Sequence, residues 1–145
     1  VNDVFDSIRY AAQKKELRLI TDVSSDIILM ADYEVTKIII RNLTNNAIKF
    51  TPSGGKITVS AQRNTTMVTI QVADTGIGIK PEVVNQLFKL DKSFTNKGTE
   101  GELGTGLGLV LCHDFIKTHG GDIWVKSEPG LGSTFYFTLP VAGTD

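Results

Sequence analysis

The pattern of apolar and polar positions predicts helices and strands in turn along the first third of the chain. Apolar residues recur every three or four positions near the start, which predicts a helix over residues 3–16. Strands are predicted over residues 17–23, where the pattern alternates, and over residues 27–31, a short apolar run. A long helix is then expected from an N-cap at Asp32 to about Phe50, where a Pro-Ser-Gly-Gly run forces a turn.

Apolar and polar residues alternate in four later segments, which predict two hairpins. The first hairpin pairs residues 57–61 with residues 68–72 through a polar turn at 64–66. The second pairs residues 122–127 with residues 133–139, and the turn between them contains proline and glycine. Each of these strands is expected to bury one face only.

The segment between the two hairpins is predicted to contain a short helix, a long loop and a second helix. Pro81 is expected to open a short helix that runs through Leu87. Residues 91–105 show little periodicity, and a loop of that length inside a compact domain is usually functional or disordered. A helix is predicted from Gly106 to His119, because two glycines follow it immediately.

This order of elements predicts an α+β fold, a two-layer α/β sandwich with helices on one face of a mixed, mostly antiparallel sheet. The length of 145 residues fits one domain covering residues 1–145. The start of the chain lacks a signal peptide and an initiator Met, so we expect a fragment of a longer protein.

The amino-acid composition argues against several classes of function. Apolar residues make up 41% of the chain and charged residues 21%, which is ordinary for a soluble globular protein. The net charge of −1 argues against a broad nucleic-acid surface. No apolar run approaches the roughly 20 residues that span a bilayer. The single cysteine, Cys112, excludes an internal disulfide and is expected to be a small core residue.

The first candidate for chemistry is a polar stripe on the predicted helix that ends near Phe50. Asn42, Asn46 and Lys49 are spaced i, i+4 and i+7, so they share one helix face. An unpaired amide in a core costs about 1–3 kcal/mol, so this face is expected to meet a charged ligand or solvent. An Asn oxygen suits Mg²⁺, and a lysine one turn later would meet phosphates. A helix emerging into solvent is the alternative.

The second and third candidates are rich in glycine. Asp74 ends a buried strand ahead of Gly76 and Gly78, so its carboxylate needs a donor, which the adenine amine would supply. The alternative is an ordinary turn. Residues 104–109 form a Gly-Thr-Gly-Leu-Gly-Leu loop that opens a helix, where free N–H groups favour anions. The alternative there is a flexible hinge, and the spacing fits neither a Walker loop nor a dinucleotide fingerprint.

Together these segments resemble the catalytic, ATP-binding domain of sensor histidine kinases, over nearly the whole chain. That superfamily includes gyrase, the ninety-kilodalton heat-shock chaperones and the mismatch-repair ATPases. Residues 42–51 look like the family's N box, residues 74–78 like its first glycine box, and residues 104–109 like its second. The tail from His119 through the final strand is also similar. The resemblance therefore implies a Bergerat-type ATP-binding fold.

The resemblance also implies roles for single residues. Asn46 would bind Mg²⁺, with Asn42 near the phosphates or the metal. Lys49 would contact phosphate and Phe50 would border the adenine, whose amine Asp74 would bind. The remaining residues of the implied cofactor site are Gly76, Gly78, Ile79, Lys92, Gly104, Thr105, Gly106, Leu107, Gly108, Leu109 and Thr134.

Two of these residues carry more specific expectations. Gly78 would pack by the ring, and Thr134 is expected to face the pocket and support the adenine end. Residues 91–105 would form the ATP lid. The family often has a second phenylalanine three residues after the one matched by Phe88, and here Asp91 stands there, which leaves the role of Lys92 open.

The phosphoacceptor histidine is expected on a separate dimerisation domain, with a response-regulator receiver domain downstream. His113 and His119 are expected to be structural, because neither has the acidic neighbourhood of the family's phosphoacceptor motif. The resemblance implies that the chain is cytoplasmic and that the isolated domain is a monomer. We expect it to insert in no membrane and to bind no nucleic acid. Whether the longer parent protein is anchored in a membrane stays open. The alternative functions are an anti-sigma-type serine kinase and a non-catalytic binding module.

Overall fold

The structure is a computed structural model of the chain, and it describes residues 2–23, 33–84 and 107–141. The predicted strand at 27–31, the N-cap at Asp32 and the loop at 91–105 lie outside these residues. So does the predicted end of the short helix near Leu87.

Five strands of the described residues form one sheet in the order β1-β2-β3-β5-β4. The strands are β1 (Arg18–Asp22), β2 (Lys56–Arg63), β3 (Met67–Asp74), β4 (Asp122–Glu128) and β5 (Gly132–Pro140). β1 pairs with β2 in parallel, and every other neighbouring pair is antiparallel. Both predicted hairpins are present, and the mixed, mostly antiparallel sheet is confirmed.

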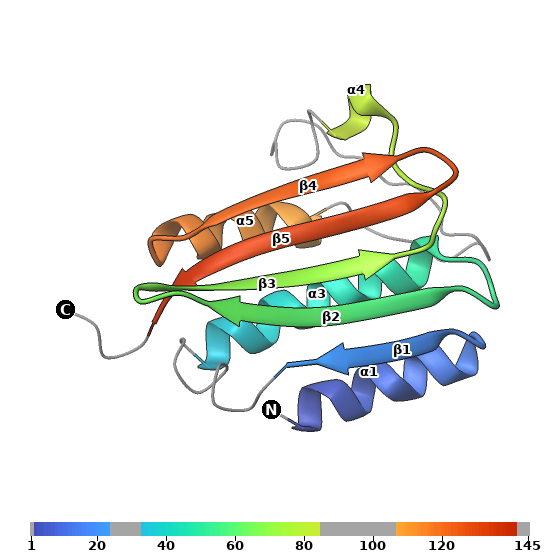
Figure 1. Cartoon of the computed structure of the whole chain (residues 1–145), viewed down its shortest axis with the longest axis horizontal. Coiled ribbons are helices and arrows are strands. Elements are labelled where there is room, and N and C mark those ends of the chain that lie inside the picture. The colour runs from blue at the N-terminus through green and yellow to red at the C-terminus, as the bar shows by residue number, and fades with distance from the viewer. Residues whose placement is uncertain (1, 24–32, 85–106, 142–145) are drawn as a thin grey trace.

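The long helices lie on one face of this sheet (Figure 1). They are α1 (Asn2–Lys14), α3 (Tyr33–Phe50) and α5 (Leu107–Thr118), and the short α4 is Pro81–Val84. α3 packs against β2, β3 and β5, α5 packs against β4 and β5, and α1 packs against α3 and β1. The predicted two-layer α/β sandwich is therefore confirmed.

The core lies between these two layers, because β2, β3 and β5 each turn alternate apolar positions toward the helices. Ile57 and Val59 of β2, Ile70 of β3 and Phe137 of β5 are almost completely buried there. Polar residues, mainly Thr and Gln, alternate with them and line the opposite, open face of the sheet. This alternation fixes which side chains of each strand can reach the helix side.

α1 ends in a Schellman motif, whose left-handed residue is usually Gly. Leu17 N donates to Ala12 O at 2.8 Å and Glu16 N donates to Gln13 O at 3.0 Å. Glu16 occupies the left-handed position with a φ of 60°. The chain therefore turns sharply from α1 into β1.

The turn after α1 is joined to the turn after α3 by three hydrogen bonds. Ser53 Oγ donates to Lys15 O at 2.9 Å, and Gly54 N donates to Glu16 O at 3.0 Å. Arg18 N donates to Gly55 O at 3.0 Å. These bonds set β1 beside β2 at the start of their parallel pairing.

Candidate functional site

The polar stripe of α3 lies on the side of the helix that faces away from the sheet core. Asn42, Asn46, Lys49 and Phe50 are all half-buried. Leu43 and Ala47, between them on the helix, are buried in the core. The sequence therefore correctly predicts that this face leaves the core.

Asn42 and Asn46 differ in their surroundings. Asn42 Nδ2 donates to Ile38 O at 3.1 Å, and its side chain also hydrogen-bonds Cys112 of α5. The structure therefore places Asn42 between two helices. Among the described residues, the Asn46 amide makes no hydrogen bond.

Lys49 and Phe50 form a pair at the end of α3. Lys49 Nζ lies 4.7 Å from the centroid of the Phe50 ring, a cation–π contact. Phe50 O accepts a hydrogen bond from Ile77 N at 3.1 Å. The last turn of α3 is thus held against the first glycine-rich loop.

Asp74 ends β3 on the helix side of the sheet, in phase with the buried Ile70 and Val72. Its Oδ1 accepts hydrogen bonds from Gly76 N at 2.9 Å and from Ser133 N at 3.3 Å. Within the described residues no hydrogen bond reaches Oδ2. Burial raises the pKa of this carboxyl, and the two backbone N–H groups oppose the shift. The second oxygen of this half-buried carboxyl is therefore an acceptor that an amine could satisfy.

Gly76 and Gly78 are required by the protein's own backbone. A Cβ at Gly76 would overlap Phe50 O and come within 2.8 Å of Asp74 Oδ1. Gly78 has a φ of 75°, and a Cβ there would overlap the backbone of Glu128 at the β4–β5 turn. These close approaches account for both glycines, and contact of Gly78 with a ring stays a prediction.

The loop of residues 75–79 also hydrogen-bonds to the second hairpin. Gly130 N donates to Ile77 O at 2.8 Å, and Ile79 N donates to Ser127 Oγ at 2.7 Å. The Ile79 side chain packs against the core. The loop therefore joins the end of α3 to the β4–β5 turn.

The predicted orientation of Thr134 is wrong. Thr134 pairs with Ala73 and Lys126 and alternates with the buried Phe135, so it lies on the open face of the sheet. Asp74 lies on the other face, where its partner in register is Ser133. Ser133, whose N–H donates to Asp74 Oδ1, is the residue on this face that the sequence analysis missed. Ser133 lies two residues before the apolar Phe135 and so on the same face of the strand, and this alternation in the sequence would have identified it.

The second glycine-rich loop lies mostly outside the described residues, which exclude Gly104, Thr105, Gly106 and Lys92. The described part, Leu107 to Leu109, forms the first turn of α5. The Leu109 side chain is buried in the core, so only its backbone could face a ligand. Cys112 is also in this core, and burial raises the pKa of its thiol to about 11.

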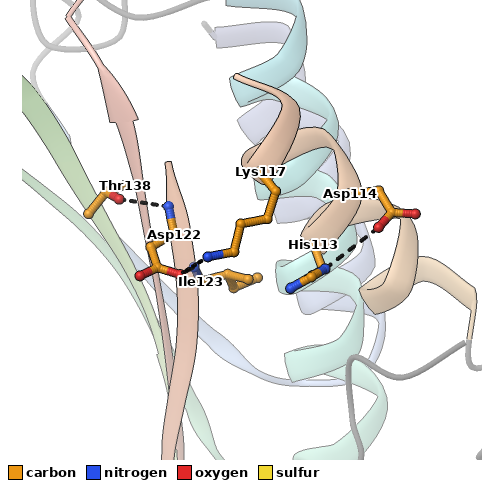
Figure 2. Close-up of polar contacts among 6 residues, drawn as sticks. All are labelled: His113, Asp114, Lys117, Asp122, Ile123 and Thr138. Atoms are coloured by element: carbon orange, nitrogen blue, oxygen red, sulfur yellow. Dashed lines mark hydrogen bonds and ion pairs between the residues drawn. The ribbon is translucent and has the colours of Figure 1, made fainter. Parts of the chain in front are cut away.

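Figure 2 shows His113 on α5, one turn before Lys117. His113 Nδ1 lies 3.6 Å from Asp114 Oδ1, so an acidic side chain does neighbour this histidine, and its structural role stays a prediction. Lys117 Nζ contacts Asp122 Oδ1 at 2.7 Å, which links α5 to β4 (Figure 2). His119, directly after α5, forms a hydrogen bond through its Nδ1 with Phe115 O at 2.7 Å, in the last turn of that helix.

Comparison with known proteins identifies close relatives. Residues 31–143 match the family described as "Histidine kinase-, DNA gyrase B-, and HSP90-like ATPase". The chain is 45% identical to the adaptive-response sensory kinase SasA of Rippkaea orientalis, over 96% of the chain and 36% of that protein. It is 38% identical to SasA of Synechococcus elongatus, over 97% of the chain and 36% of that protein. The chain thus spans about a third of the length of these curated relatives.

Solved structures of histidine kinases have the same fold as this chain. The catalytic domain of histidine kinase ThkA superposes with a TM-score of 0.79 at 29% identity, covering 97% of this chain and 91% of that one. Full-length ShkA, solved in complex with AMPPNP, gives a TM-score of 0.78 at 28% identity, covering 99% of this chain and 29% of that one. Among the helices of the described residues, none combines the length and apolar character of a membrane span.

Proposed function

The chain belongs to the family of histidine kinase-, DNA gyrase B- and HSP90-like ATPases, and from this premise we propose that it is the ATP-binding domain of a sensor histidine kinase. In this proposal, residues 1–145 bind Mg-ATP as one domain. The γ-phosphoryl group then passes to a histidine on a separate domain. Similarity to kinases named SasA and to the catalytic domain of ThkA supports this function over a serine kinase or a non-catalytic module.

One observation carries the proposal: the half-buried Asp74 carboxylate has one oxygen held by two backbone N–H groups. The other oxygen accepts no hydrogen bond from the described residues. An adenine amine is a donor of the right kind for it, whereas guanine presents an acceptor at the same ring position. Ser133, beside Asp74, takes the place proposed for Thr134 at the adenine end.

The end of α3 supplies the other half of the proposed site. Lys49 would contact the phosphates, and Phe50 would border the adenine from a position fixed by its bond to Ile77. The free N–H groups at the start of α5 would face the phosphates from a second direction. The triphosphate would then lie between α3 and α5, which pack together.

The residues present fit a magnesium ion carried by the nucleotide. Among the described residues there is no cluster of three or more His, Cys, Asp or Glu side chains that could hold a metal. Mg²⁺ commonly binds few protein ligands and takes the rest from phosphates and water. The unengaged Asn46 oxygen suits that role, with Asn42 one turn away. The bound ion would neutralise charge on the phosphates.

The chain's own contribution to phosphoryl transfer would be positioning and charge neutralisation. Asp74 would fix the adenine end, and Lys49 would hold the phosphates against the start of α5. The acceptor would be a histidine of the kinase's dimerisation domain, and the phosphoryl group would pass on to a response-regulator receiver domain.

Titration with a fluorescent ATP analogue tests the nucleotide site. We expect saturable binding that weakens when EDTA removes Mg²⁺. Asn46→Ala should weaken binding about tenfold, which corresponds to about 1.4 kcal/mol, because it removes the magnesium-binding oxygen. The matched control is Asn45→Ala, since Asn45 is exposed on the same turn. Equal affinity of both variants, or binding indifferent to Mg²⁺, would refute the assignment of Asn46.

Labelled ATP tests the phosphoryl transfer. We expect no stable phosphate on the chain alone, because His113 pairs with Asp114 on α5 and His119, directly after α5, hydrogen-bonds the Phe115 carbonyl, so both histidines have structural contacts. Phosphate should appear on a histidine-bearing dimerisation domain from the same full-length protein when the two are mixed. Phosphohistidine on the isolated chain would contradict this prediction, and phosphoserine on a partner would favour the serine-kinase alternative.

A further inference from the structure

Lys15 is a lysine buried inside the helical layer, with 7% of its surface exposed. Its Nζ donates to Ile48 O at 2.7 Å and to Lys49 O at 3.1 Å. Lysine is almost never fully buried unless it is paired. Here the partners are the carbonyl groups at the end of α3.

The ends of helices explain why a lysine is favourable at this place. The last four carbonyl groups of a helix lack partners within it, and they carry the negative end of the helix dipole. An ammonium group at this end satisfies two of these carbonyl groups and opposes the dipole. Lys15 therefore caps α3 from a different element of the fold.

The backbone of Lys15 is itself fixed by the turn that follows α1. It lies at the end of α1, directly before the left-handed Glu16 of the Schellman motif. Its carbonyl accepts the hydrogen bond from Ser53 Oγ at 2.9 Å. The ammonium group is thus anchored by the α1–β1 turn while it holds the end of α3.

The capped turn leads into the nucleotide site. The turn that Lys15 holds carries Lys49 and Phe50, and Phe50 O accepts the hydrogen bond from Ile77 N. Ile77 O in turn accepts the hydrogen bond from Gly130 N. An unbroken series of contacts therefore runs from Lys15 through the end of α3 to the first glycine-rich loop.

We propose that Lys15 is a positioning residue of the nucleotide site, which sets the last turn of α3 and through it the first glycine-rich loop. Its role rests on the proposed function, because Lys49 and Phe50 are the ligand-binding groups that it positions. Lys15 lies outside residues 31–143, the part that matches the family. The N-terminal helix α1 is thereby a component of the site.

The test compares Lys15→Met, which keeps the length of the side chain but removes its donors, with Lys15→Arg, which restores them. Lys14→Met is the matched control, because Lys14 is the exposed neighbour on the same helix. The first measurement is the Ile77 backbone amide resonance by NMR without nucleotide. The second is the affinity for Mg-ATP. The catalytic domain of ThkA is a separate chain of similar extent, so the isolated domain is a suitable sample.

We expect Lys15→Met to shift the Ile77 amide resonance and to weaken Mg-ATP binding about tenfold, within the range for losing hydrogen bonds to a charged group. Lys15→Arg should restore both, and Lys14→Met should change neither. An unmoved Ile77 resonance, unchanged affinity, or a loss that Arg fails to restore would overturn the proposal. If Lys15→Met does not fold, Lys15→Gln, which keeps one neutral donor, should give intermediate values in both measurements, and wild-type values would overturn the proposal.

The two measurements also separate this proposal from the proposed function. If the wild-type chain bound no Mg-ATP, the proposed function would fail and the proposal for Lys15 with it. If the wild type bound Mg-ATP and Ile77 did not respond to Lys15→Met, only the positioning role would fail.

Discussion

Asp74→Asn is expected to weaken Mg-ATP binding by about 10- to 100-fold, equivalent to about 1–3 kcal/mol. Asn keeps the oxygen that accepts from Gly76 N and Ser133 N, so the local backbone should be preserved. It replaces the second oxygen by an NH₂ group, which would meet the adenine amine donor to donor. The ratio of affinities for guanine and adenine nucleotides should rise accordingly, and calorimetric titration with ATP and GTP measures both effects.

The same substitution should stabilise the folded domain near neutral pH. Burial raises the pKa of Asp74, so the folded chain holds this proton more tightly than the unfolded chain. Ionisation of Asp74 therefore lowers stability as the pH rises through the raised pKa. Asn carries no such cost, so the variant should gain stability over the wild type above that pKa. The gain should vanish in acid, below the carboxyl's ordinary pKa.

Asp122→Asn is the control, since its dependence on pH has the opposite sign. The hydrogen bond from Lys117 lowers the pKa of Asp122, so this group contributes stability that is lost as the pH falls through the lowered pKa. Asp122→Asn should slightly destabilise the domain at neutral pH and leave ATP binding unchanged. A folded Asp74→Asn variant with wild-type ATP affinity would disprove the adenine assignment.

Gly78→Ala is expected to lower the free energy of unfolding by about 2–5 kcal/mol, because two costs act together. The φ of 75° is left-handed, which is strained for Ala. The added Cβ would also overlap the Glu128 backbone, so the β4–β5 turn would have to move. Urea unfolding measures the loss.

Gly130→Ala separates the two costs. Gly130 lies in the β4–β5 turn with a φ of 82°, and a Cβ there would meet no atom within 4 Å. The Gly130→Ala variant should lose only about 1–2 kcal/mol of its free energy of unfolding, which is the cost of the left-handed backbone. If both variants lost the same amount, backbone strain alone would explain Gly78, and the contact between loop and turn would carry no stability.

The phase of apolar residues in the strands is predictable from sequence because it is local. Phe135, Phe137 and Leu139 alternate with polar residues, and the structure buries all three. The error at Thr134 arose because the residue was chosen by resemblance to a motif. The same alternation assigns Ser133 to the face of Asp74 and excludes Thr134.

Contacts between distant segments were not predictable from local pattern. Ile8, Ala12 and Lys15 are spaced i, i+4 and i+7, so the sequence places Lys15 on the buried stripe of α1. The carbonyl groups that justify its burial belong to α3, more than 30 residues later, since Lys15 and Ile48 are 33 positions apart. The parallel pairing of β1 with β2 is hidden in the same way, because no short turn joins the two strands.

The glycines illustrate a third limit of prediction from sequence. The sequence predicts that Gly78 makes room for a ligand, and the structure shows that the Glu128 backbone approaches it instead. Both readings require the absence of a side chain, and a sequence alone does not say which neighbour approaches.

The strand order also determines how the sheet meets other molecules at its two edges. Within the described residues, β1 and β4 are the edge strands, and each could in principle pair with a strand from another chain. β4 carries Asp122, Lys126 and Glu128 at exposed positions, and the five-residue β1 begins and ends with exposed Arg18 and Asp22. Short length and charge both disfavour strand addition. The edges of this sheet are therefore protected against aggregation by their own sequence.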